Sequence, residues 1–149
     1  MSNFKKNLIN VLGFKKNKFH PLVITSDNIT FGQNVYIGAF SEIYSKNSNI
    51  KIGDNCDIAS FVSINSEDSH KKTIGIKKKN ESKRILIGKN VFIGSHSFIK
   101  GGTEIGNYSV VAAGSIVGPG KIPPYSLVYG NPMKVKKGYY KKKLKKKIL

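Results

Sequence analysis

The sequence predicts an all-β protein, a parallel β-helix, because its aliphatic residues follow a period of six. From Ile87 an aliphatic residue recurs at every sixth position, through Ile93, Ile99, Ile105, Val111 and Val117. Glycine follows directly at Gly88, Gly94, Gly106 and Gly118, and the fourth position after each aliphatic residue is small or β-branched. A period of six matches neither a helix nor a simple strand. It fits a short strand and a tight turn, repeated three times in each triangular coil.

The upstream chain shows the same pattern in two shorter blocks, one from Phe31 to Ile43 and one from Ile52 to Ile64. The step of nine residues between these blocks places three extra residues near positions 46–49. The gap of 23 residues between Ile64 and Ile87 predicts an excursion over residues 65–86. The β-helix is therefore expected to occupy residues 21–133.

The two tails are expected to be short basic helices. Stacked coils leave two exposed ends, and a solenoid needs caps there. Residues 1–20 contain Phe4, Leu8, Val11 and Leu12 at helical spacing, and residues 134–149 contain Tyr140, Leu144 and Ile148 at intervals of four. These segments are interpreted as an N-terminal helix or cap and a C-terminal helix.

The distribution of charge separates the tails from the body. The net charge is +18, but residues 1–18 and 134–149 hold 14 of the 26 Lys and Arg and none of the 8 acidic residues. No base-reading motif accompanies this charge, so nucleic acid is not an expected partner. Basic amphipathic tails are compatible with peripheral contact to an anionic membrane, but capping of the trimer and the solenoid is the preferred interpretation.

The single cysteine, Cys56, excludes an internal disulfide and fits a reducing cytoplasm. It falls at a small-residue position of the repeat, which predicts a core role. No apolar run approaches the roughly 20 residues of a membrane span. The expected location is the cytoplasm, or the inner face of the membrane if the tails bind lipid.

Two segments resemble the hexapeptide-repeat acetyltransferases. They are ILIGKNVFIGSHSFIKGGTEIGNYSVVAAGSIV (Ile85–Val117) and IPPYSLVYGNPMKV (Ile122–Val135). The nearest likeness is to galactoside- and maltose-type sugar O-acetyltransferases. The resemblance implies a left-handed β-helix and a homotrimer with active sites between subunits. It also implies direct transfer from acetyl-CoA to an acceptor, with no metal.

His70 is the predicted catalytic residue. Direct transfer needs a base that takes the acceptor's proton, and the unperturbed pKa of histidine suits this role. His70 lies in the excursion, where the family's catalytic histidine lies, and Glu67 or Asp68 is close enough in sequence to fix its tautomer. His96 is expected at a cleft wall or surface, and His20 is expected to be structural.

The resemblance also assigns residues to the coenzyme. Ser95 and Ala113 match small positions that line the pantetheine channel, and Gly130 and Pro132 match the ending that turns the chain beneath the coenzyme. Basic residues are expected near its phosphates. Those assigned are Lys121, Lys134 and Lys137, where Lys121 ends a GPGK turn that departs from the family's usual one.

The acceptor is less well specified. Tyr36, Glu42 and Tyr44 are candidates for acceptor contact, and each is equally compatible with surface packing. Basic residues of the excursion either rim a cleft or form a solvated charge run: Lys71, Lys72, Lys77, Lys78, Lys79, Lys83 and Arg84.

Three functions are compatible with these features. The first is O-acetylation of a sugar or a surface-polysaccharide precursor. The second is N-acetylation of an amino sugar, often nucleotide-linked, and the third is a non-catalytic basic scaffold that binds membrane or nucleic acid. A zinc carbonic anhydrase on the same fold is not expected. It needs three protein ligands, usually histidines, and only His70 and His96 fall within the repeat body.

Overall fold

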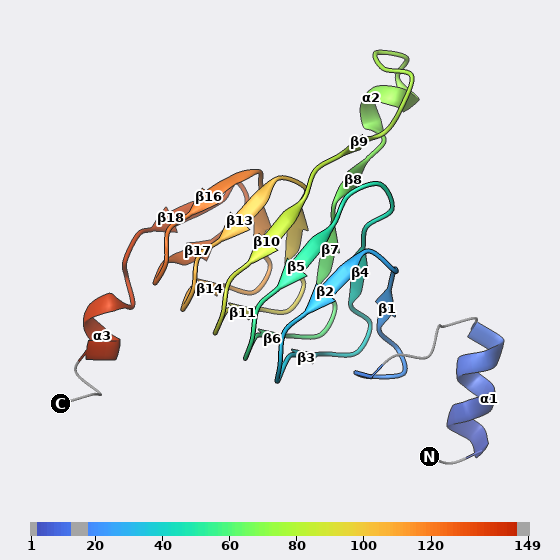
Figure 1. Ribbon diagram of the computed structural model, residues 1–149, viewed down its shortest axis with the longest axis horizontal. Helices are drawn as coiled ribbons and strands as arrows, with labels where there is room; N and C mark the ends of the chain where they lie inside the picture. Colours follow the sequence, from blue (N-terminus) through green and yellow to red (C-terminus); the bar gives the residue numbers. More distant parts are fainter. Residues whose placement is uncertain (1–2, 13–17, 146–149) are drawn as a thin grey trace.

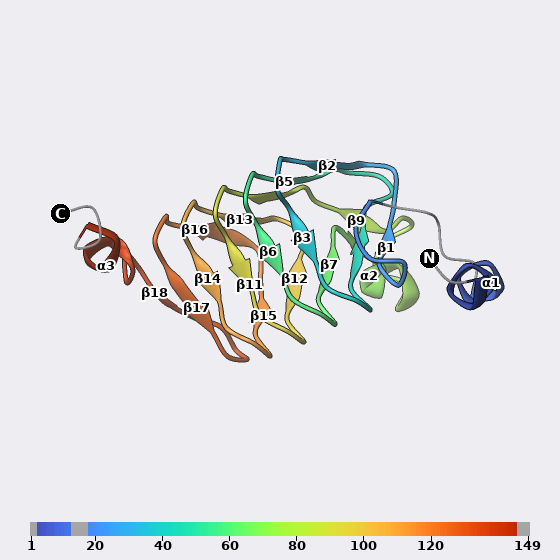
Figure 2. The same cartoon turned by 90° about the horizontal axis from the view of Figure 1, so that it is seen from below.

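The computed structural model describes residues 3–12 and 18–145, and its body is a left-handed parallel β-helix of about five coils (Figure 1). This confirms the predicted fold. Helix α1 (Asn3–Leu12) precedes the coils and helix α3 (Lys141–Lys145) follows them. Figure 2 shows the two helices at opposite ends of the solenoid. Among the described residues, no helix is long and apolar enough to span a bilayer.

Three parallel sheets, here named A, B and C, form the sides of the triangular coil. Sheet A contains β1 (Ile24–Thr25), β4 (Glu42–Tyr44), β7 (Ser63–Asn65), β12 (Phe98–Lys100) and β15 (Ile116–Val117). Sheet B contains β2 (Ile29–Phe31), β5 (Ile50–Ile52), β10 (Ile85–Ile87), β13 (Thr103–Ile105) and β16 (Gly120–Ile122). Sheet C contains β3 (Tyr36–Ile37), β6 (Asp57–Ile58), β11 (Phe92–Ile93), β14 (Val110–Val111) and β17 (Leu127–Tyr129), with β18 (Lys134–Lys136) antiparallel at its edge.

The core is a set of aliphatic stacks that run along the solenoid axis. Ile52 pairs with Ile87 on the next coil, and Ile87 pairs with Ile105 on the coil after that. These inward residues are almost fully buried, because each strand presents alternate side chains to the inside. The six-residue period therefore reflects one inward residue on each side of the triangle.

Two of the three corners keep a constant length along the solenoid. At the corner between sheets B and C, Asn34, Asn55 and Asn90 have φ values of 52°, 55° and 54°. Asparagine tolerates this left-handed conformation better than most residues, which explains its recurrence in the turn. At the corner between sheets C and A, Phe40, Phe61 and His96 occupy the equivalent left-handed position and stack on one another.

The corner between sheets A and B, the A/B corner, takes up every change in coil length. The excursion leaves it after β7 and returns at β10, and contains β8 (Glu67–Asp68), α2 (His70–Thr73) and β9 (Glu81–Ser82). Figure 1 shows it as an arm that projects from the solenoid. The predicted bounds of 65–86 are slightly too wide, because Asn65 ends β7 and Ile85 and Leu86 belong to β10.

The tails differ in part from the predicted helices. Residues 134–136 form β18 rather than helix, because the alternation of Lys134, Val135 and Lys136 gives an edge strand beside β17. Helix α1 lies within the predicted N-terminal segment, and its Phe4 and Val11 side chains are exposed. Ile148 lies outside the described residues. The capping role of the tails stays a prediction.

Candidate functional site

The base of the excursion is held by the Glu67 carboxylate. Its Oε1 accepts hydrogen bonds from the backbone N–H groups of Lys46 (3.0 Å) and Asn47 (2.9 Å) and from Ser82 Oγ (2.7 Å). Burial raises the pKa of Glu67, but these hydrogen bonds outweigh it and lower the pKa to about 2. An ionised Glu67 therefore ties β8 and β9 to the preceding coil.

His70 opens helix α2 at the start of the arm. Its Nδ1 contacts Asp68 Oδ1, and its backbone N–H donates to the same oxygen at 3.1 Å. The other carboxylate oxygen, Asp68 Oδ2, lies 3.0 Å from Lys100 Nζ. Contact with His70 and then with Lys100 holds the pKa of Asp68 well below its usual range. Of the two predicted carboxylate partners of His70, the structure therefore selects Asp68.

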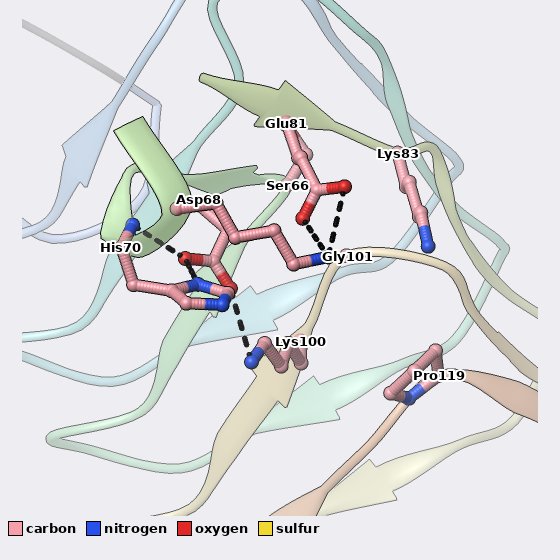
Figure 3. Close-up of a pocket in the computed structure, with 9 residues that line it drawn as sticks. Ser66, Asp68, His70, Glu81, Lys83, Lys100, Gly101 and Pro119 are labelled. Carbon is pink, nitrogen blue, oxygen red and sulfur yellow. Dashed lines mark hydrogen bonds and ion pairs between the residues drawn. The ribbon is translucent and has the colours of Figure 1, made fainter. Parts of the chain in front are cut away.

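These groups line a cavity of about 180 Å³ at the A/B corner (Figure 3). Lys71 Nζ lies 2.9 Å from Glu81 Oε2, and Lys83 and Lys100 also line the cavity. Contacts with Lys77 and Lys71 lower the pKa of Glu81 to about 2. The remaining lining residues are Ser66, Gly101 and Pro119. The arrangement is a polar pocket with an oriented imidazole at its edge.

Most of the predicted coenzyme residues gather at another place, the corner between sheets C and A. Ser95, Ala113 and Gly130 continue the paired register of β11, β14 and β17 on three successive coils, so they form one column. The Gly114 N–H donates to the Ser95 carbonyl at 2.9 Å, and the Ile116 N–H donates to the Gly130 carbonyl at 3.2 Å. The column presents backbone and small side chains, which suits a narrow, extended ligand.

Close packing within this column depends on glycine. A Cβ built on Gly94 would lie 2.5 Å from the backbone nitrogen of Ala113, which is too close for any side chain. Pro132 follows the column after a cis peptide bond with Asn131, and Lys134 pairs with Tyr129 across β17 and β18. Gly130, Pro132 and Lys134 are therefore neighbours at the C-terminal end of the column.

Two of the predicted coenzyme residues lie elsewhere. Lys121 is on the outer face of sheet B, with its Nζ 3.5 Å from Glu104 Oε2. Lys137 follows Lys136, which pairs with Leu127 at the end of β17 remote from Gly130. Within one chain, neither Lys121 nor Lys137 lies beside the column.

One chain also separates His70 from the column. Lys100, which contacts Asp68, and Ser95 lie at opposite ends of the same side of the triangle, because Ser95 precedes strand β12 at the turn and Lys100 ends it. The sequence indicated both groups of residues but not this separation. It also missed Lys100, which pairs with Asn65 in the register of β12 and β7 and so lies beside the exit of the excursion.

The remaining histidines and Cys56 do not line the His70 pocket. His96 stacks on Phe61 with ring centroids 4.9 Å apart, and His20 Nδ1 accepts the Leu22 N–H at 3.1 Å. Cys56 is buried, and burial raises the pKa of its thiol. In the part of the chain that the structure describes, no group of three His, Cys, Asp or Glu side chains is placed to hold a metal ion.

Of the three acceptor candidates, Tyr36 is exposed, whereas Glu42 and Tyr44 are half-buried in β4. None of the three lines the His70 pocket.

Comparison with known proteins agrees with the fold and the repeats. Residues 84–119 match the bacterial transferase hexapeptide (six repeats), and residues 28–65 match the hexapeptide repeat of succinyl-transferase. The crystallised galactoside acetyltransferase in complex with coenzyme A superposes with a TM-score of 0.72 at 29% identity, over 94% of this chain and 82% of that one. The chain belongs to the hexapeptide-repeat acetyltransferase family.

Two curated relatives are similar over shorter segments. One is the dTDP-3-amino-3,6-dideoxy-alpha-D-galactopyranose 3-N-acetyltransferase of Aneurinibacillus thermoaerophilus, which is 46% identical over 56 residues. The other is the galactoside O-acetyltransferase of Escherichia coli (strain K12), which is 51% identical over 51 residues. These matches cover 38% and 34% of this chain, and 28% and 25% of the relatives. The chain thus matches about a quarter of each relative's length.

Proposed function

We propose that the protein is an acetyl-CoA-dependent acetyltransferase that acts on a hydroxyl of a sugar or a surface-polysaccharide precursor. The observation that carries this proposal is the pairing of His70 Nδ1 with an ionised Asp68 at the edge of a polar pocket. This pairing keeps the proton on Nδ1 and leaves Nε2 with a free lone pair. The likeness to a galactoside acetyltransferase that binds coenzyme A supports the choice of donor.

The chemistry assigned to His70 is general-base catalysis. Nε2 accepts the proton of the acceptor hydroxyl while that oxygen attacks the thioester carbonyl carbon. The carbon–sulfur bond then breaks, and the imidazolium returns the proton to the departing thiolate. Asp68 stabilises the transient positive charge on His70, and Lys100 holds Asp68 in place.

The column of Ser95, Ala113 and Gly130 is the proposed channel for the pantetheine arm. Its small side chains allow close approach of a narrow chain, and its turns carry backbone N–H groups. Pro132 and Lys134 follow the column and extend this proposed site toward the coenzyme's phosphates. Lys121 and Lys137 lie away from the column of their own chain. They are therefore proposed to contact the phosphates of a coenzyme A molecule that is bound in the column of a neighbouring subunit.

A homotrimer accounts for the separation of the two corners. His70 and the column lie on different corners of one triangle, so a complete site requires the A/B corner of one subunit to face the column of the next. Closed threefold symmetry repeats this contact three times.

The test of the proposal is release of free coenzyme A, measured with a thiol reagent over a panel of sugar acceptors. We expect His70→Ala to lower turnover by roughly 100-fold or more, which is the usual contribution of a general base. His20→Ala is the matched control, because the His20 imidazole accepts the Leu22 N–H and does not line the His70 pocket. Full activity of His70→Ala would refute the proposed role of His70 as general base. Failure of the wild type to bind acetyl-CoA would refute the proposed acetyltransferase activity.

The second candidate is N-acetylation of an amino sugar. It is favoured by the likeness to an N-acetyltransferase that acts on a dTDP-linked amino sugar. The same panel decides between the two if it contains matched pairs of sugars, such as galactose and galactosamine. Acetylation of the amine alone would replace the O-acetyltransferase proposal by this one.

Contact with a membrane is a separate proposal for the tails. Helix α1 exposes Phe4 and Val11 beside Lys6, a composition that suits an anionic lipid surface. Such contact would keep the enzyme at the inner face of the membrane rather than free in the cytoplasm. Co-sedimentation with vesicles that contain phosphatidylglycerol, compared with purely zwitterionic vesicles, tests this location. No binding to the anionic vesicles would refute it.

A further inference from the structure

The charges around the His70 pocket are not balanced. Three ammonium groups line it, those of Lys71, Lys83 and Lys100, against the two carboxylates of Asp68 and Glu81. Both carboxylates have lowered pKa values and are therefore ionised near neutral pH. The pocket accordingly carries an excess of one positive charge before His70 is counted.

Both carboxylates are fully engaged with other groups. Asp68 contacts His70 through Oδ1 and Lys100 through Oδ2. Glu81 contacts Lys71 through Oε2 and Lys77 through Oε1. Neither is left to neutralise the third ammonium group.

Lys83 is the cation that remains. Among the described residues it makes no ion pair, whereas Lys71 and Lys100 each make one. In Figure 3 Lys83 lies on the side of the pocket away from His70 and Asp68, and no interaction is drawn to its ammonium group. Of the three lysines that line the pocket, Lys83 is therefore the one whose ammonium group has no carboxylate partner among the described residues.

The backbone of Lys83 is held at the base of the arm, and its side chain is exposed at the rim of the pocket. Its N–H donates to the Ser66 carbonyl at 3.0 Å, which fixes the residue beside the end of β7. A Cβ built on Gly102 would lie 3.3 Å from Lys83 Cδ and 3.1 Å from Pro119 Cβ. The absence of a side chain at Gly102 thus leaves room for the aliphatic stem of Lys83 across this turn.

We propose that Lys83 binds a carboxylate or phosphate group of the acceptor, so that the preferred acceptor of this enzyme is anionic. The inference rests on the proposed function and names the substrate class of the same site. The acceptor is the partner in question, because Lys83 shares its pocket with the imidazole that must reach the acceptor's hydroxyl or amine. Within one chain the proposed channel for the coenzyme lies at a different corner, and in the proposed trimer the neighbouring subunit's channel faces this pocket, so the KM for acetyl-CoA is measured beside that for the acceptor.

The experiment compares acceptor pairs that differ in one anionic group. The probes are galactose with galacturonate, for a carboxylate, and glucosamine with glucosamine 6-phosphate, for a phosphate. We expect the wild type to have a lower KM for at least one anionic member, and Lys83→Gln to raise that KM about tenfold, as expected for loss of one hydrogen bond to a charged group. KM for the neutral member and for acetyl-CoA is expected to stay unchanged.

Two control variants separate this role from general charge. Lys83→Arg keeps the positive charge and is expected to retain most of the preference. Lys78→Gln removes one positive charge from an exposed position of the same excursion, outside the pocket, and is expected to change nothing. The proposal is overturned if Lys78→Gln acts like Lys83→Gln, if only the KM for acetyl-CoA rises, or if the wild type shows no preference for an anionic acceptor.

Failure of the proposed function has a different signature. If the wild type releases no coenzyme A with any acceptor, the enzymatic proposal fails and direct binding decides the role of Lys83. Calorimetric titration with galacturonate and with glucosamine 6-phosphate, each against its neutral counterpart, then gives the answer. Lys83-dependent binding of an anionic probe supports the anion site, and equal binding by Lys83→Gln refutes it.

Discussion

Asp68 uses its two carboxylate oxygens on partners from different coils. One oxygen meets His70 two residues later in the chain, and the other meets Lys100 on the next coil. The pKa of Asp68 is lowered by these contacts, so the group stays ionised throughout the range in which a histidine titrates. The acid limb of the pH–rate profile should therefore not reflect protonation of Asp68.

The first prediction concerns Asp68→Asn. An amide at this position has no negative charge and does not specify which imidazole nitrogen carries the proton. We expect kcat to fall by roughly 10- to 100-fold with little change in the KM for acetyl-CoA. Lys100→Met, which leaves the contact between His70 and Asp68, is expected to cost less. Steady-state kinetics across pH 5.5–9 measure both variants, and an unchanged kcat in Asp68→Asn would contradict the positioning role.

A second prediction at this scale is a pH-dependent contribution of Glu67 to stability. Its pKa in the folded protein is about 2, below the ordinary value of 4.5 for this carboxyl group. A lowered carboxyl pKa adds stability that is fully present above the unfolded-state pKa and is lost as the pH falls through the folded-state value. Thermal melting should show Glu67→Gln less stable than wild type at pH 7. The difference should narrow as the pH falls from about 4.5 toward 2, and a constant difference would exclude this linkage.

At the scale of the element, each short strand is stabilised by one side chain that points inward. Strand β5 illustrates the contrast, because Ile52 is buried and its neighbour Lys51 is exposed. We expect Ile52→Ala to lower the free energy of unfolding by about 2–5 kcal/mol, through lost burial and a residual cavity. Lys51→Ala, one position away, should change it by less than about 0.5 kcal/mol. Denaturant unfolding measures both variants, and equal effects would contradict the assigned orientation.

The spacing of coils gives a further prediction at the glycines. A Cβ at Gly94 meets the backbone of Ala113, whereas a Cβ at Gly118 has nothing within 4 Å. Gly94→Ala should therefore destabilise the protein by about 1–3 kcal/mol and weaken coenzyme binding at the adjacent column. Gly118→Ala should be neutral or slightly stabilising. Melting temperature and calorimetric titration with coenzyme A test the pair, and tolerance of alanine at Gly94 would contradict the close packing of the coils.

Most elements of the solenoid were predictable, because the inward residue at every sixth position reflects a local rule. Ile87, Ile93 and Ile99 mark one strand each, and their partners follow from the 18-residue coil. The arm is different, because β8 and β9 pair with each other and carry no repeat. Sequence reasoning therefore found where the arm begins but not its internal structure. Likewise it indicated His70 with two candidate carboxylates but not Lys100, whose position depends on a register spanning 35 residues.

At the scale of the whole molecule, the main question is how the two corners meet. A trimer would have a mass of three times the 16.4 kDa of one chain, which analytical ultracentrifugation can measure. A monomer at micromolar concentration would contradict the proposed assembly.

Mixed trimers test whether the site is shared between subunits. His70→Ala inactivates the base, and Ala113→Trp blocks the proposed channel on the other corner. If the two variants are inactive alone and are refolded together in equal amounts, about a quarter of the interfaces should carry both intact corners. Coenzyme A release should then recover to about a quarter of the wild-type rate. Absence of any recovery would place the whole site within one chain.

The A/B corner alone changes length from coil to coil, while the other two corners keep a constant spacing. Sheet B partners are therefore 21 residues apart from Ile29 to Ile50 and 35 apart from Ile50 to Ile85, yet the strands still pair in register. An insertion at the A/B corner can therefore differ in length or sequence without changing the register of the stacked strands. Exchange of residues 66–84 between relatives should transplant acceptor preference as a cassette. Recognition of acetyl-CoA would remain with the coils of the β-helix. Acceptor specificity and donor specificity could therefore change independently during evolution.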